Sequence, residues 1–214
     1  KTAEKKLSTT KKIFKQIKDN GVEDPNHTIV FVPFGNKKNQ DETSEHRINL
    51  YTKMISGLGI DVRQFEKKDR EKIIKQFKEK TIGVLTAMKT MDEGVDIPEI
   101  KRAVFVASSS NEREYIQRRG RILRVYKDPS GKEKIAEVYD LIVEPNTESA
   151  LEGEEYDMKQ KIKAMEKNIL RKEINRVINF LYACDNINDL SSDEKQDFIK
   201  LIILIKIIII RWYI

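Results

Sequence analysis

The chain has 214 residues, of which 39% are hydrophobic and 36% charged, so it can form one ordinary domain plus an appendage. Its single cysteine, Cys184, excludes an intramolecular disulfide, and two histidines, His27 and His46, leave no zinc-finger spacing. The net charge of +6 favours polyanionic partners, although lysine-rich proteins from AT-biased genomes are basic for compositional reasons too.

The lysine-rich start carries no targeting signal that we recognise. No apolar segment follows it, so we expect no secretory signal, and the absence of an initial methionine indicates a fragment or a processed piece. Residues 7–19 show helical spacing of apolar side chains, and Gly21 and Pro25 then end the pattern. Together with the single cysteine, these features predict cytoplasmic localisation.

From position 28 onward, apolar strands alternate with helices. The expected strands are "TIVFVPF" (28–34), "GIDVRQF" (59–65), "TIGVLTA" (81–87), "RAVFVAS" (102–108) and, after the turn "KDPSGK", "KIAEVYDLIV" (134–143). The expected helices are residues 43–57 and 67–80. Strands that are apolar on consecutive residues are covered on both faces. The order therefore predicts an α/β domain over residues 1–145, with a mainly parallel sheet flanked by helices.

Residues 146–214 are expected to form a helical extension. Apolar residues recur near helical spacing from Ile162 to Leu181 and predict a long helix, and "SSDE" at 191–194 has the capping-box form that starts another. The terminal "LIILIKIIIIRWYI" is shorter than the roughly 20 apolar residues that span a bilayer, and Lys206 interrupts it. We expect a helix or strand buried against a partner surface, or an effect of where the chain was cut, and no membrane role.

The arginine-rich stretch "YIQRRGRILR" at 115–124 is one candidate site. On a helix, one face would carry Gln117, Gly120, Arg121 and Arg124. Ile116 and Leu123, a heptad apart, are expected to dock onto the sheet. Two guanidinium groups one turn apart beside a glycine can neutralise a phosphate chain with better-defined geometry than two lysines. A solvated arginine-rich helix is the alternative interpretation.

The loop "AMKTMDEGVDIPEI" that follows the strand "IGVLT" is the second candidate site. Loops that leave the C-terminal ends of parallel strands hold the ligands of α/β sheets. Gly94 allows a positive φ, and Asp96 offers a carboxylate suited to a ribose hydroxyl. Asp92 and Glu93 invite comparison with a D-E-x-D magnesium box, but Asp96 comes one residue too late. We therefore expect no metal site here.

Taken together, these segments resemble the C-terminal RecA-like lobe of superfamily 2 helicases. "TIVFVPF" resembles motif IV, "VLTAMKTMDEGVDIPEI" motif V and "QRRGRILR" motif VI, whose pattern is Q-x-x-G-R-x-x-R. The resemblance covers about residues 28–143, in the family's order and with the "REKIIKQF" helix before motif V. Motif VI begins with Gln117 and not with the histidine typical of RNA DEAD-box proteins. The chain looks more like the excision-repair and restriction-type branches, so DNA is preferred over RNA.

The resemblance implies a role for each matching residue. At ATP it implies that Arg121 and Arg124 are arginine fingers at the γ-phosphate and that Asp96 contacts the ribose. It also places three residues beside the nucleotide, namely Gln117, Gly94 and Gly120. At the backbone of the tracked strand it implies Thr86, Thr90, Phe34 and Gly35. An arginine finger raises the rate of phosphoryl transfer by roughly 10³ to 10⁵.

The sequence lacks the motifs that bind phosphates and magnesium in this family. It contains no G-x-x-x-x-G-K-[ST] loop and no D-E-x-D/H segment after an earlier strand. We therefore expect this chain to be inactive alone and to complete an ATP site, with Mg²⁺ held by the N-terminal RecA-like lobe of the same parent protein. The alternatives are an inert lobe used as a nucleic-acid or protein scaffold, and an RNA helicase. A free-standing Rossmann enzyme is excluded because Gly57 and Gly59 lack a third glycine and follow a helix.

Overall fold

The computed structural model divides the chain into two compact units, Lys1–Asp140 and Leu141–Ile214. It describes residues 2–19, 24–33, 44–65, 68–88, 97–106, 136–143, 151–153, 155–181 and 207–213, and between them residues 120, 122, 124, 126–127, 130–131 and 133–134. A domain boundary between residues 145 and 146 stays a prediction.

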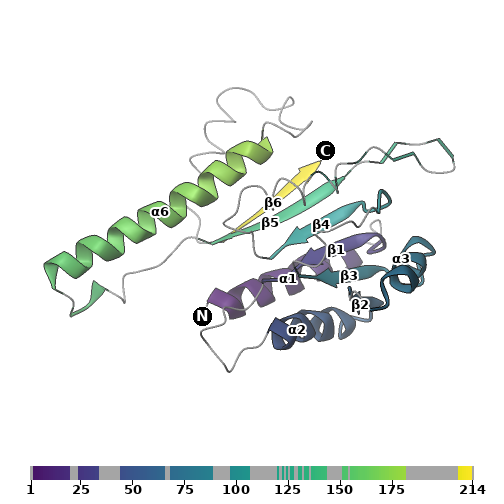
Figure 1. Ribbon diagram of the computed structural model, residues 1–214, viewed down its shortest axis with the longest axis horizontal. Coiled ribbons are helices and arrows are strands. Elements are labelled where there is room, and N and C mark those ends of the chain that lie inside the picture. Colours follow the sequence, from purple (N-terminus) through teal and green to yellow (C-terminus); the bar gives the residue numbers. More distant parts are fainter. Residues whose placement is uncertain are drawn as a thin grey trace. The chain divides into compact units, whose positions relative to one another are not determined.

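A parallel sheet forms the centre of the first unit (Figure 1). Its strands are β1 (Thr28–Phe31), β2 (Val62–Gln64), β3 (Val84–Ala87), β4 (Arg102–Phe105) and β5 (Glu137–Val143). They stand in the order β2-β3-β1-β4-β5, and each neighbouring pair is parallel. The predicted α/β fold with a mainly parallel sheet is confirmed.

Three central strands are buried along their whole length. Every residue of β1, β3 and β4 is buried, as their consecutive apolar residues predict, whereas β2 at the edge is partly exposed. The register pairs Thr28 of β1 with Val84 on one side and with Arg102 on the other. The three strands therefore start level with one another.

Three helices of the first unit each bury one apolar stripe. They are α1 (Thr2–Asp19), α2 (Ser44–Ser56) and α3 (Arg70–Lys78), and Figure 1 shows α1 and α2 side by side. The buried stripes consist of Ile13, Phe14 and Ile17, of Ile48, Tyr51 and Ile55, and of Ile73 and Phe77. The predicted helices are confirmed, although α1 begins five residues before the predicted start because its first turn carries no apolar periodicity.

Charged residues are buried where β4 and β5 start. Arg102 and Glu137 are paired across the two strands, and their side chains are only 9% and 8% exposed. Arg102 Nε donates to Glu137, while Nη1 donates to the Asp24 carbonyl at 3.1 Å and to Thr28 Oγ1 at 3.4 Å. The Tyr139 hydroxyl donates to Glu137 Oε1 at 2.8 Å. This network ties β5 to β4 and to the start of β1.

The described residues of the second unit include the end of β5, one long helix and a further strand. Helix α6 (Tyr156–Leu181) has 26 residues, which confirms the predicted long helix, and β6 (Ile207–Tyr213) follows β5 in the strand order. Residues 207–213 of the terminal run thus form a strand, so this part of the predicted helical extension is not helical. The helix predicted to start at 191–194 lies outside the described residues.

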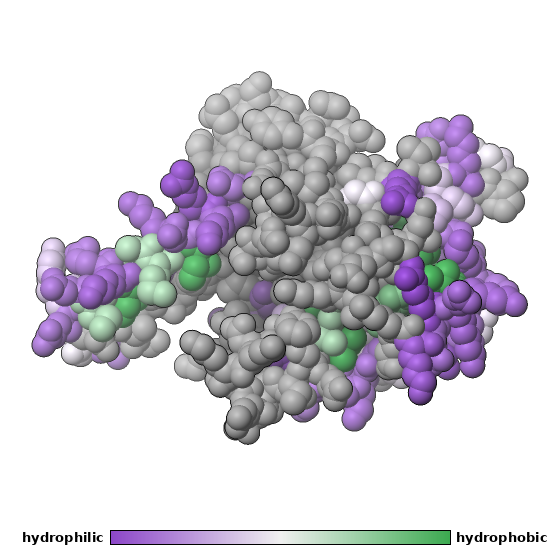
Figure 2. Space-filling model, viewed as in Figure 1, coloured by the Kyte–Doolittle hydropathy of each residue, from purple (hydrophilic) through white to green (hydrophobic). Residues whose placement is uncertain are grey.

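The long helix exposes apolar side chains to solvent. The exposed ones are Tyr156, Met158, Met165 and Ile169. Figure 2 shows green atoms among purple ones where Figure 1 draws α6. Nowhere in the described ranges is a helix both long enough and apolar enough to cross a membrane.

Candidate nucleotide and nucleic-acid interface

The three buried strands end together at one edge of the sheet. Phe31, the last residue of β1, pairs with Ala87 of β3 and with Phe105 of β4. The hydrogen bonds continue one residue further, because Val32 N donates to the Ala87 carbonyl at 2.8 Å and Val106 N to the Phe31 carbonyl at 3.1 Å. The segments with motif IV, motif V and motif VI residues therefore leave the sheet from adjacent strand ends, where α/β sheets bind ligands.

Two aromatic rings reinforce this edge. Phe31 and Phe105 stack with their centroids 4.8 Å apart and an interplanar angle of 11°, and both are almost completely buried. Stacked aromatic rings add to the stabilisation that burial alone provides. The ends of β1 and β4, from which the following loops start, are thus packed into the core and shielded from water.

Thr86 lies inside the fold on β3 and is completely buried. Its hydroxyl is 2.8 Å from Thr52 Oγ1 on α2 and 3.4 Å from the Arg63 carbonyl on β2. Thr52 Oγ1 also donates to the Ile48 carbonyl at 2.7 Å. The Thr86 hydroxyl is therefore engaged by neighbouring elements, and its contact with nucleic acid stays a prediction.

Three residues of the arginine-rich stretch are described. Gly120 is helical and exposed, Ile122 is helical and completely buried, and Arg124 is exposed and no longer helical. Ile122 is therefore still helical and Arg124 is not, so the helix ends one or two residues short of the second predicted arginine. A Cβ at Gly120 would meet nothing within 4 Å, so space inside this chain does not demand glycine there. The residue that docks is Ile122, while the predicted Ile116 and Leu123 lie outside the described residues.

Lys134 joins the arginine-rich stretch to the exit of motif V. Its Nζ donates to the Ile122 carbonyl at 2.8 Å and to the Pro98 carbonyl at 2.9 Å. Burial lowers the pKa of this half-buried ammonium to about 8, and the Glu99 carboxylate acts in the opposite direction. Sequence reasoning missed Lys134, because a lysine before an apolar strand has the pattern of an ordinary surface residue.

A short hairpin carries Lys134. Lys127 and Glu133 form an antiparallel bridge and an exposed ion pair of 3.0 Å, and the Lys134 amide donates to the Tyr126 carbonyl at 2.8 Å. Gly131 turns the chain with a φ of 82°, which favours glycine. This hairpin forms around the predicted "KDPSGK" turn and fixes the backbone from which Lys134 projects.

Most of the predicted site residues lie outside the described ranges. They are Gln117, Arg121, Gly94, Asp96, Thr90, Phe34 and Gly35. Their roles at ATP and nucleic acid therefore stay predictions. Among the residues that the structure describes, no three His, Cys, Asp or Glu side chains form a group that could hold a metal ion.

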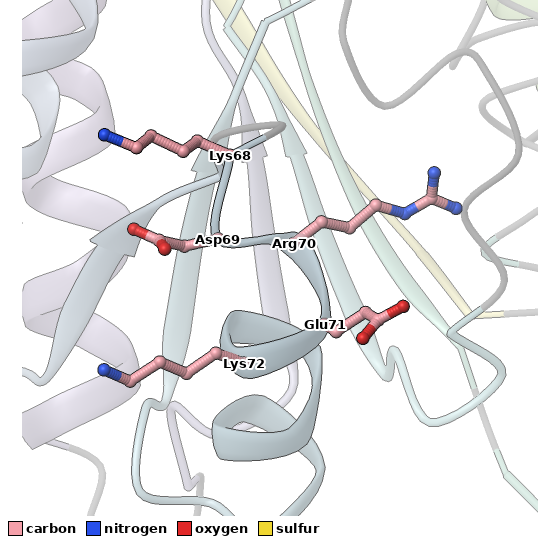
Figure 3. Close-up of a pocket in the computed structure, with 5 residues that line it drawn as sticks. All are labelled: Lys68, Asp69, Arg70, Glu71 and Lys72. Atoms are coloured by element: carbon pink, nitrogen blue, oxygen red, sulfur yellow. The ribbon is translucent and has the colours of Figure 1, made fainter.

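A surface hollow of about 440 Å³ lies at the start of α3, away from the predicted motifs in sequence. It is lined by Lys68, Asp69, Arg70, Glu71 and Lys72. Figure 3 shows Lys68, Asp69 and Lys72 pointing to one side and Arg70 and Glu71 to the other. Since charges of both signs diverge from one another, these residues do not form a set that could grip one ligand.

Comparison with known proteins agrees with this architecture. A DNA 3'-5' translocase, XPB2, from Sulfurisphaera tokodaii is 37% identical over 59 residues, which are 28% of this chain and only 13% of that protein. The crystal structure of the C-terminal part of the Fun30 ATPase domain matches with a TM-score of 0.50 and 16% identity, over 68% of this chain and 43% of that one. The Hef helicase domain of Pyrococcus furiosus matches with a TM-score of 0.40 and 24% identity, over 56% and 22%.

The family comparison covers the three motifs. The helicase conserved C-terminal domain matches residues 6–126, which is more than half of the chain and includes β1, β3, β4 and the arginine-rich stretch. The fold, the order of the motifs and this match agree. The chain belongs to the helicase conserved C-terminal domain family.

Proposed function

We propose that this chain is the C-terminal motor lobe of an ATP-dependent DNA helicase or translocase. In this proposal, an N-terminal RecA-like lobe binds ATP together with Mg²⁺, and this lobe closes on the nucleotide. The observation that carries it is the common edge, where segments from three motifs leave adjacent parallel strands within the family match. The name of the archaeal translocase supports DNA as the nucleic acid.

Arg121 and Arg124 would stabilise the charge that develops on the transferred phosphoryl group. Phosphoryl transfer needs little covalent chemistry from the protein, so correctly placed positive charge supplies most of the rate. Asp96 would bind the ribose, and Gln117, Gly94 and Gly120 would lie beside the nucleotide. Arg124 is exposed to solvent in this lobe.

Thr90, Phe34, Gly35 and the segment around Thr86 would follow the backbone of the tracked strand. Closure and reopening of the two lobes would then move the protein along that strand. Because these segments and the arginines start from the same edge of the sheet, one movement of this lobe would change both contacts together.

ATP hydrolysis stimulated by nucleic acid tests the proposal. We would compare the isolated chain, the full-length protein, and full-length protein carrying Arg124→Ala, each with DNA and with RNA. We expect turnover from the wild-type full-length protein alone, with stronger stimulation by DNA and a loss of about 10³-fold or more in Arg124→Ala. The matched control is Arg171→Ala, an exposed arginine of α6, which should keep wild-type turnover.

One result would decide against the motor, and a second would decide against the arginine fingers. If full-length protein hydrolyses no ATP but binds DNA, the lobe is a nucleic-acid scaffold. If Arg124→Ala turns over at the rate of Arg171→Ala, the arginine-finger assignment is wrong. Stronger stimulation by RNA would retain the motor and change its substrate.

A further inference from the structure

We infer that Lys134 is a positioning residue that holds the end of the motif VI helix against the exit of motif V, and so sets where Arg124 stands. Lys134 itself lies outside the three motifs, whereas its two acceptors, Ile122 and Pro98, lie in motif VI and motif V. The consequence of the inference for catalysis rests on the proposed function, whereas the mechanical link between the two segments does not.

The geometry is that of a helix cap supplied from a distant segment. The last carbonyls of a helix lack intrahelical partners, and a lysine ammonium can satisfy them. Lys134 donates to the carbonyl of Ile122, which is helical and lies two residues before the non-helical Arg124, and the same ammonium donates to the Pro98 carbonyl. One cation therefore fixes the separation between two segments that are not adjacent in the sequence.

Each end of this link is anchored in the core. The Ile122 side chain is completely buried, and the turn at Pro98 is held by buried Ile97 and Ile100, whose backbones share a hydrogen bond of 3.2 Å. The backbone of Lys134 is held as well, because its amide N–H donates a hydrogen bond to the Tyr126 carbonyl. The ammonium therefore joins three pieces of backbone that cannot shift independently.

Charged groups face Lys134 from each of the segments that pack against it. On the motif V side, the Glu99 carboxylate raises the pKa of Lys134, and Glu99 Oε1 also pairs with Lys78 at 3.0 Å. On the motif VI side, Arg124 is exposed. On the hairpin that carries Lys134, Glu133 pairs with Lys127. Since the folded-state pKa of Lys134 lies near 8, below the 10.5 of an ordinary lysine, folding disfavours its charged form at neutral pH. This cost offsets part of the stability that the two hydrogen bonds of the ammonium contribute.

Placement of Arg124 is what the charged form can provide. Arg124 is two residues beyond the carbonyl that Lys134 holds, and misplacing a catalytic group by about 1 Å can cost on the order of 10²-fold in rate. Charge-assisted hydrogen bonds are stronger and shorter than neutral ones, so an ammonium holds the two carbonyls more firmly than a neutral amine.

Steady-state ATP hydrolysis by full-length protein gives the first test, with Lys134→Met and the hairpin control Lys127→Met. Lys134→Met keeps the length of the side chain and removes its donors. We expect kcat to fall about tenfold or more with KM for DNA within about twofold, and the urea midpoint to change little, because the lost hydrogen bonds and the relieved cost of burying the charge oppose each other. Lys134→Arg should recover most of kcat, because it restores charged donors. A kcat of Lys134→Met within twofold of Lys127→Met would overturn the inference.

The pH dependence gives a readout that a merely structural residue would not move. In wild type we expect kcat to fall a few-fold as pH rises through about 8, since the neutral amine keeps donors but loses its charge. Lys127→Met should show the same fall and Lys134→Met none. An identical fall in Lys134→Met would contradict the inference.

Cleavage by an arginine-specific protease separates this inference from the proposed function. The arginine-rich stretch offers several cleavage sites, and Lys134→Met should speed their cleavage several-fold in native protein while Lys127→Met does not. Equal cleavage rates in the two variants would overturn the link. If the wild type hydrolyses no ATP, the proposed function fails while this cleavage test still decides the role of Lys134.

Discussion

The contacts of the buried ion pair between Arg102 and Glu137 predict how much stability the protein loses when Glu137 is replaced. We expect Glu137→Leu to lower the free energy of unfolding by about 3–5 kcal/mol, because it leaves a buried guanidinium without its countercharge. Glu137 accepts one charge-assisted hydrogen bond from Arg102, worth about 1.5–3 kcal/mol, and one from the Tyr139 hydroxyl, worth about 0.5–1.5 kcal/mol. The two contacts together account for most of the expected loss.

A double variant separates the ion pair from the space it fills. Arg102→Met with Glu137→Leu removes both charges, so its free energy of unfolding should lie within about 1–2 kcal/mol of wild type. The exposed pair of Lys127 and Glu133 serves as the control, because its side chains are 60% and 68% exposed and its loss should cost less than about 1 kcal/mol.

Urea unfolding followed by far-UV circular dichroism measures these differences. The network lies at the starts of the strands, so KM for DNA should remain at the wild-type value wherever the variants are folded. The reasoning is refuted if Glu137→Leu loses less than about 1 kcal/mol, or if the double variant is as unstable as the single one.

Two further predictions concern buried polar groups. Thr52→Val and Thr86→Val should each cost about 1 kcal/mol of stability, because the two hydroxyls bond each other. If Thr86 touches DNA, only its variant will also weaken binding in fluorescence anisotropy, and equal affinities would argue against that contact. Burial lowers the pKa of His27, so as pH falls below about 6.5 the unfolded chain takes up a proton more readily and stability falls. In His27→Asn the urea midpoint should vary less with pH between about pH 5 and 7, and asparagine tolerates the φ of 59° at this position. A variant whose urea midpoint varies with pH as in wild type would contradict this.

The sheet could be predicted because its strands carry their own signal. β1, β3 and β4 are apolar on consecutive residues, and helices of the right period separate the strands, so the parallel order follows from local patterns. The ends of the strands are less predictable, because β1 ends at Phe31 although the apolar run continues to Phe34. An apolar run says which residues are buried and does not say where pairing with neighbouring strands stops.

The candidate site could be predicted only as far as its motifs reach. The spacing of the arginine-rich stretch predicted a helix with one docked face, but not that the helix ends before Arg124. Lys134 contacts carbonyls 36 and 12 residues away, and Thr86 is held by Thr52, 34 residues away. Such contacts depend on how elements pack together, and neither periodicity nor composition records them.

The level ends of β1, β3 and β4 have a consequence for how a ligand would be captured. Neighbouring strands lie about 4.8 Å apart, and β1 lies between β3 and β4. The first residues after β3 and β4 therefore lie within about 10 Å of each other. Groups tethered at such distances meet at effective concentrations on the order of millimolar or higher. A ligand that binds one of these loops is therefore already close to the others. Lengthening a loop would weaken its contribution to binding gradually. Shifting one strand by a single residue would instead move the start of its loop by about 3.3 Å and separate the loops at once.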